Sequence, residues 1–140
     1  MHIEVGPVSA ASARAWIAYA TETVAYLRTL PEQQVPAHAL DAFASLLDEW
    51  RPIAQRDEPF RWSSEEPPER AQYLLNALYV AGTRIEEEAA AGRAHLRPQA
   101  ADEFHIVLVR EVLDTLAHES DAYAHFVQEM RNVWDIARPS

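Results

Sequence analysis

The chain has 140 residues, with 22 acidic and 12 basic side chains, a formal net charge of −10 and no cysteine. This length suits one domain, and the absence of cysteine excludes disulfides, thiolate catalysis and cysteine-ligated zinc. The negative charge disfavours binding to nucleic acids and to anionic membrane surfaces, because both require a protein that neutralises phosphates.

The composition also bears on location and fold class. The start of the chain, MHIEVGPVSAASARAW, has no basic segment followed by an apolar core, and no uncharged apolar run approaches the roughly 20 residues that cross a bilayer. We therefore expect a cytoplasmic protein.

Lysine is absent, a bias typical of GC-rich bacterial genomes. With three glycines and no Asn-Gly or Asp-Gly hairpin signal, the sequence predicts an all-α fold.

The first half of the chain predicts an arm followed by helices. Residues 1–8 are expected to form an extended N-terminal arm. A first helix should begin near Ser9 or Ser12, either of which can cap free N–H groups, and should end before Pro31. Its apolar residues recur at intervals of three and four, which gives the helix one buried stripe.

Prolines delimit the next elements. Pro36 suits the first turn of a second helix, and Pro52 ends or kinks that helix because proline lacks the backbone N–H of a helix interior. Residues 52–66 are expected to form an irregular connection. The Pro-Pro pair that follows opens a third helix, which Gly92 closes.

The last segment, residues 98–138, keeps a helical period, although FHIVLV within it could pass for a strand. Ser120 and Asp121 are good N-cap residues, so the segment forms either one helix or two. Four to five helices with short links predict an antiparallel bundle, and residues 1–140 are expected to form a single compact domain.

Acids and histidines recur at helical spacing in this last segment, and an Asp-x-x-His pair lies at its start. These candidate metal ligands are Asp102, His105, Asp114, His118, Asp121 and His125. Most of them lie opposite the apolar seam of the helix, whereas metal sites in bundles face inward. A solvated face, with His105 as a core histidine, is therefore the favoured interpretation, and no cofactor is expected.

One stretch resembles a known family. FRWSSEEPPERAQYLL, residues 60–75, resembles the Trp-Ser entry to the second helix of metal-binding bundles related to DNA-damage-inducible hydrolases and thiol transferases. The resemblance implies a histidine soon after the Trp-Ser pair and a later HxxxH pair. No histidine occurs between Trp62 and His95, and HxxxH occurs nowhere. The activity of that family is therefore not expected.

Two stretches are candidates for partner binding. In EPFRW, the residues Phe60, Arg61 and Trp62 would form a binding hot spot if exposed, and would cover one end of the bundle if not. In RIEEEAAAGRAH, three acids lie near a predicted helix C-terminus, where the helix dipole disfavours them, so they are candidates for docking an arginine-rich segment. These acids are Glu86, Glu87 and Glu88.

Taken with the missing catalytic motifs, these features predict a non-catalytic regulatory or adaptor protein that acts through protein–protein contacts. Wide apolar helix faces favour a homodimer. One alternative is a metal- or small-ligand-binding bundle, with or without enzymatic activity, that uses His105, His118 and nearby carboxylates. A second alternative is an acidic inhibitor or immunity-type protein that masks a basic partner.

Overall fold

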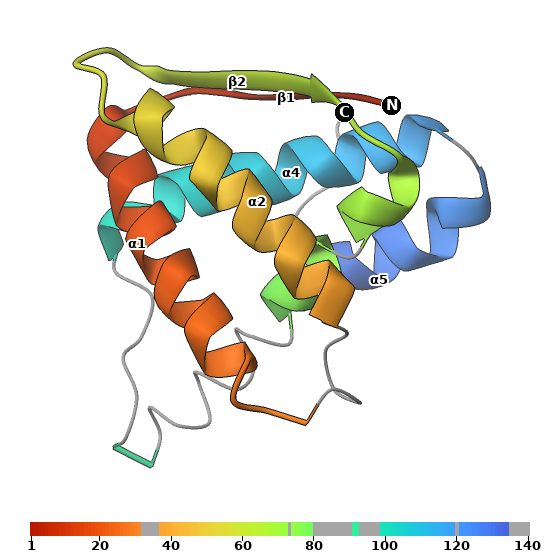
Figure 1. The fold of residues 1–140 in the computed structure, drawn as a ribbon. Helices are drawn as coiled ribbons and strands as arrows, with labels where there is room; N and C mark the ends of the chain where they lie inside the picture. The colour runs from red at the N-terminus through yellow and green to blue at the C-terminus, as the bar shows by residue number, and fades with distance from the viewer. Residues whose placement is uncertain (32–36, 73, 80–90, 93–98, 120, 135–140) are drawn as a thin grey trace.

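The computed structural model describes residues 1–31, 37–72, 74–79, 91–92, 99–119 and 121–134. The main elements are β1 (His2–Val8), α1 (Ala10–Leu27), α2 (Ala37–Ala54), β2 (Phe60–Glu65), α4 (Asp102–Glu119) and α5 (Ala124–Trp134). Residues 68–72 and 74–79 are also helical, and short 3₁₀ turns precede α4 and α5. The chain is mostly helical, as predicted (Figure 1). None of the helices in the described ranges has the length and apolar character needed to cross a membrane.

A two-stranded sheet departs from the all-α prediction. β1 and β2 pair in antiparallel orientation, with His2 opposite Glu65 and Val5 opposite Trp62. Figure 1 shows the sheet lying along one side of α1, α2 and α4. Residues 1–8 are thus extended, but as a paired strand rather than an arm. An antiparallel bundle of four to five helices is not confirmed, because the sheet takes one side of the core.

Alternating side chains explain both strands. Ile3 and Val5 in β1 are 3% and 1% exposed, whereas the alternate residues His2 and Glu4 face outward. β2 repeats this pattern, so each strand has one apolar face that can be buried only against the helices. The prediction of an irregular connection over residues 52–66 is therefore wrong: α2 continues to residue 54, and β2 begins at residue 60.

The pairing is irregular between Val5 and Val8. Gly6 there has a φ of +110°, a conformation that side chains rarely adopt. A Cβ atom on Gly6 would lie 2.3 Å from the backbone oxygen of Phe60, which leaves no room for any other residue.

The first helices begin and end largely where the sequence indicates. The Ser9 hydroxyl accepts a hydrogen bond from the backbone N–H of Ser12 at 3.1 Å, so Ser9 is the N-cap of α1. α1 ends before Pro31, as predicted, while Pro36 lies outside the described residues. Pro52 does not end α2, which continues for two further residues.

An aromatic cluster joins the sheet to three helices. Trp50 of α2 is at its centre, with ring centroids 5.3 Å from Trp62 of β2, 5.6 Å from Phe104 of α4 and 5.9 Å from Trp16 of α1. Phe60 of β2 packs against the same group. Tilted and edge-on contacts of this kind stabilise a core beyond the area that they bury. The cluster therefore fixes the strands to the helices.

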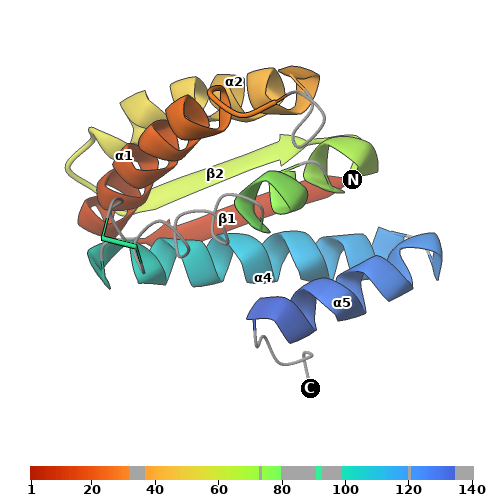
Figure 2. The ribbon, with the colours of Figure 1, turned by 90° about the horizontal axis from the view of Figure 1, so that it is seen from below.

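The C-terminal segment forms two helices rather than one. α4 ends at Glu119, a 3₁₀ turn follows, and α5 lies back along α4 (Figure 2). The Arg131 side chain of α5 is 5% exposed and donates to a carboxylate oxygen of Asp114 on α4 at 2.8 Å. A buried ion pair with this geometry fixes one helix against the other.

Candidate functional site

The change from α4 to α5 divides the predicted stripe of acids and histidines. Asp114 and His118 lie on α4, Asp121 lies in the 3₁₀ turn, and His125 lies on α5. The Nδ1 atom of His118 lies 2.7 Å from the backbone oxygen of Asp114, so it donates to its own helix. In the part of the chain that the structure describes, no three acidic or histidine side chains are grouped as metal ligands.

His105 is a core residue. It is 6% exposed, and its Nδ1 atom accepts the indole N–H of Trp16 at 3.1 Å. Because an indole nitrogen can only donate, the proton of the neutral His105 ring lies on Nε2. Asp102 occupies the first turn of α4, where a carboxylate complements the helix dipole. Both residues thus have structural roles.

The aromatic residues predicted as a partner contact lie inside the protein. Phe60 is fully buried, Trp62 is 7% exposed, and the Trp62 indole N–H donates to Glu49 at 3.1 Å. The strand alternation leaves only Arg61 of this trio exposed. The two aromatic side chains therefore pack in the core rather than on an exposed surface. The second predicted patch, Glu86–Glu88, lies outside the described residues.

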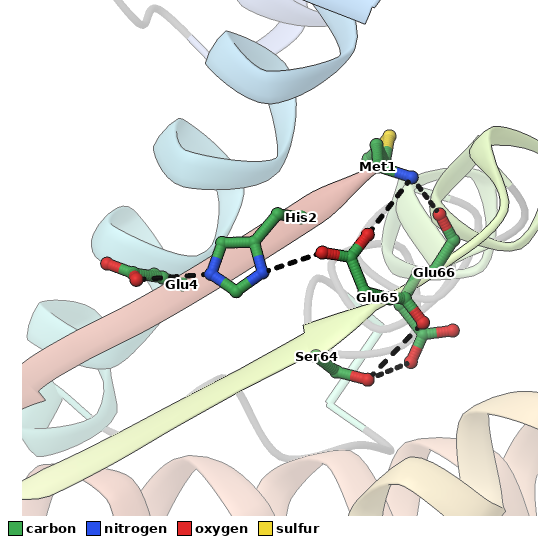
Figure 3. Close-up of polar contacts among 6 residues, drawn as sticks. All are labelled: Met1, His2, Glu4, Ser64, Glu65 and Glu66. Carbon is green, nitrogen blue, oxygen red and sulfur yellow. Dashed lines mark hydrogen bonds and ion pairs between the residues drawn. The ribbon is translucent and has the colours of Figure 1, made fainter.

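A cluster of charged groups lies where β1 starts and β2 ends (Figure 3). The two ring nitrogens of His2 lie 3.1 Å from Glu4 and 3.0 Å from Glu65. These hydrogen bonds, first to Glu4 and then to Glu65, raise the pKa of the exposed His2 ring above 6.5. The amino group of Met1 donates to the backbone oxygen of Glu66 at 2.8 Å. Two carboxylates thus flank one imidazole, Glu4 from the same strand and Glu65 from the paired strand.

Glu111 of α4 extends this charge across to the helix. Its pKa is raised above 4.5, first by burial and then by repulsion from Asp114, with Glu4 of β1 adding to the effect and Arg110 opposing it. Electrostatic coupling therefore runs from α4 to the sheet. We call the surface formed by Glu4, Glu65 and Glu111 the acidic face.

Sequence patterns alone do not identify the acidic face. The alternation in HIEV could have placed Glu4 on the outer side of a strand, and helical spacing could have placed Glu111 on one side of α4. Only the pairing of β1 with β2 brings Glu65 to the same place, and no local turn signal indicates a pairing between residues 63 positions apart. Comparisons with family models, curated proteins and solved structures give no match for the chain.

Proposed function

We propose that the chain is a non-catalytic regulatory or adaptor protein that binds a basic protein partner through the acidic face. The grouping of the exposed Glu4 and Glu65 at 3.1 and 3.0 Å from the two ring nitrogens of His2 carries this proposal, and the raised pKa of Glu111 supports it. Ionising that carboxyl is opposed by its own burial and by the negative charges of Asp114 and Glu4. An arginine or lysine supplied by a partner would relieve that repulsion and would favour association.

The state of the histidines supports a non-catalytic role. The Nδ1 atoms of His105 and His118 are both used in hydrogen bonds to Trp16 and to the α4 backbone. Those bonds hold each ring in place rather than presenting it to a substrate. The metal- or ligand-binding alternative that relies on these two rings therefore has less support than partner binding.

The acidic face also suits an inhibitor or immunity-type protein, if the basic partner is an enzyme. If binding abolished the activity of that enzyme, the result would favour the inhibitor role over a general adaptor role.

We also propose a homodimer and a cytoplasmic location. The homodimer is supported by two large apolar side chains at the surface, Tyr79 and Ile106, which are 39% and 44% exposed. Light scattering tests the dimer directly.

The test measures binding of a fluorescein-labelled nona-arginine peptide by fluorescence anisotropy at low and high salt. The test variant replaces the three glutamates of the acidic face by glutamine. A matched control variant removes three exposed acids from α1 and from the connection between α2 and β2, through Glu22→Gln, Asp57→Asn and Glu58→Gln. Both variants have the same net charge, so a general effect of charge is the same in each.

We expect the acidic-face variant to bind the peptide at least about tenfold more weakly than the wild type. The control variant should retain most of the affinity, and added salt should weaken binding to the wild type. Equal losses in the two variants would show that only net charge matters, and would contradict the proposal. Circular dichroism of each variant confirms that the fold is retained.

A further inference from the structure

The imidazole ring of His2 lies between two of the three carboxylates of the acidic face (Figure 3). Its Nδ1 atom lies 3.0 Å from the carboxylate of Glu65 on β2, and its Nε2 atom lies 3.1 Å from that of Glu4 on β1. All three side chains are at least half exposed, so a partner can reach them. One imidazole thus occupies two of the acids that are proposed to bind a basic partner.

The protonation state of His2 decides how many of these contacts form. An imidazolium ring has two N–H donors, so it donates to both carboxylates at once. A neutral ring has one N–H donor and one lone pair, so it donates to only one carboxylate, and its lone pair repels the other. Loss of the proton therefore frees one carboxylate and makes the acidic face more negative by one charge.

The surrounding charges make this one proton significant. α4 packs against β1, and the carboxyl of Glu111 on α4 is affected by the charge of Glu4. The charged groups that the described structure places around His2 are the amino group of Met1, Glu4, Glu65, Arg110, Glu111 and Asp114. Carboxylates outnumber cations in this set, so a protonated His2 offsets part of an excess of negative charge.

The change of charge falls in an accessible pH range. The hydrogen bonds to Glu4 and then to Glu65 raise the pKa of His2 above 6.5, so the ring gains or loses its proton near neutral pH. Arginine side chains of a partner stay charged throughout that range. A change of affinity with pH would therefore arise in this chain and not in an arginine-rich partner.

We propose that His2 regulates the acidic face: its protonated ring occupies Glu4 and Glu65 and weakens the binding of a basic partner, whereas its neutral ring releases a carboxylate to that partner. This inference rests on the function proposed for the acidic face. Because the proton and the partner compete for the same carboxylates, each lowers the affinity of the other by the same factor. Binding should therefore strengthen as the pH rises through the pKa of His2.

The test measures binding of a tetramethylrhodamine-labelled nona-arginine peptide by fluorescence anisotropy at about pH 6 and about pH 8.5, between which most protein histidines titrate. The measured quantity is the ratio of the dissociation constants at the two pH values. We expect this ratio to be about three- to tenfold larger in the wild type than in His2→Gln, the effect of one unit charge a few ångströms away. The other titrating groups are common to both proteins.

Two further variants make the assignment specific. His2→Arg places a permanent cation beside the same carboxylates and should bind the peptide weakly at both pH values. His38→Gln removes an exposed imidazole from the first turn of α2, outside the acidic face, and should keep the wild-type ratio. Because His2 and His38 are both exposed, these substitutions should leave the fold unchanged, which circular dichroism checks.

An NMR titration of His2 with and without saturating peptide gives a second readout. Bound peptide should lower the pKa of His2 by the logarithm of the same ratio, an effect that a purely structural contact would not produce. Equal pH ratios in the wild type and His2→Gln, or a His2 pKa that the peptide leaves unchanged, would overturn this inference and leave the proposed function standing. Absence of binding at both pH values would overturn the two together.

Discussion

Replacing Phe60 with alanine tests whether β2 is part of the core. The side chain is 0% exposed, and its ring centroid lies 5.1 Å from that of Phe104 and 6.1 Å from that of Trp50. Truncating such a residue removes its buried area and leaves a cavity, which together cost about 4 kcal/mol of unfolding free energy. A 140-residue protein unfolds with an entropy of about 0.3 kcal/mol/K, so the melting temperature should fall by about 13 °C.

The assay is urea denaturation followed by far-ultraviolet circular dichroism, because the helices dominate this signal. Arg61→Ala, one residue along the same strand and exposed, is the control and should change the unfolding free energy by less than about 0.5 kcal/mol. A cost below about 1 kcal/mol for Phe60→Ala would refute the burial of this strand against the helices. Similar costs for the two variants would refute the strand alternation.

Three further results are expected from the same contacts. The pKa of His2, measured by NMR titration, should lie above 6.5, because the two flanking glutamates stabilise the charged ring. The stabilisation by these contacts is complete below pH 6.5 and is lost as the pH rises through the folded-state pKa. The advantage of wild type over His2→Gln should therefore shrink as the pH rises above 6.5, and a constant difference would contradict this. Asp114→Ala removes the carboxylate that the buried Arg131 contacts and should cost about 2 kcal/mol, with faster amide exchange in α5 as the local signature. Gly6→Ala should cost at least about 2 kcal/mol in a thermal melt, because the added Cβ meets the backbone of Phe60 and φ is +110°; an unchanged melting temperature would show that the strands can move apart.

The helices were largely predictable because their signals are local. A serine before an apolar stripe located the start of α1, and good N-cap residues indicated where the last segment would divide if it formed two helices, as it does. The strands were not predicted, although His2–Val5 and Phe60–Glu65 both alternate inward and outward residues. Their partners are distant in the chain and no hairpin turn joins them, so the pairing energy has no local signature.

The candidate site illustrates the same limit. Spacing along one helix suggested that Asp114 and His118 share a face with His125, but the helix ends before His125 and that face is divided. Conversely, the electrostatic effect of Glu4 on Glu111 depends on how β1 packs on α4, which no periodicity encodes. The core position of His105 followed from its apolar neighbours, but its partner Trp16 lies 89 residues away and could not be inferred.

The pairing of β1 with β2 also constrains the order of folding. His2 meets Glu65 across 63 positions, so the sheet closes a long loop that contains α1 and α2. Closing such a loop costs entropy before any contact compensates for it, whereas α1 and α2 are neighbours and can associate early. During synthesis the first strand therefore waits for its partner until residue 65 has emerged. Substitutions in the sheet should consequently speed unfolding more than they slow folding.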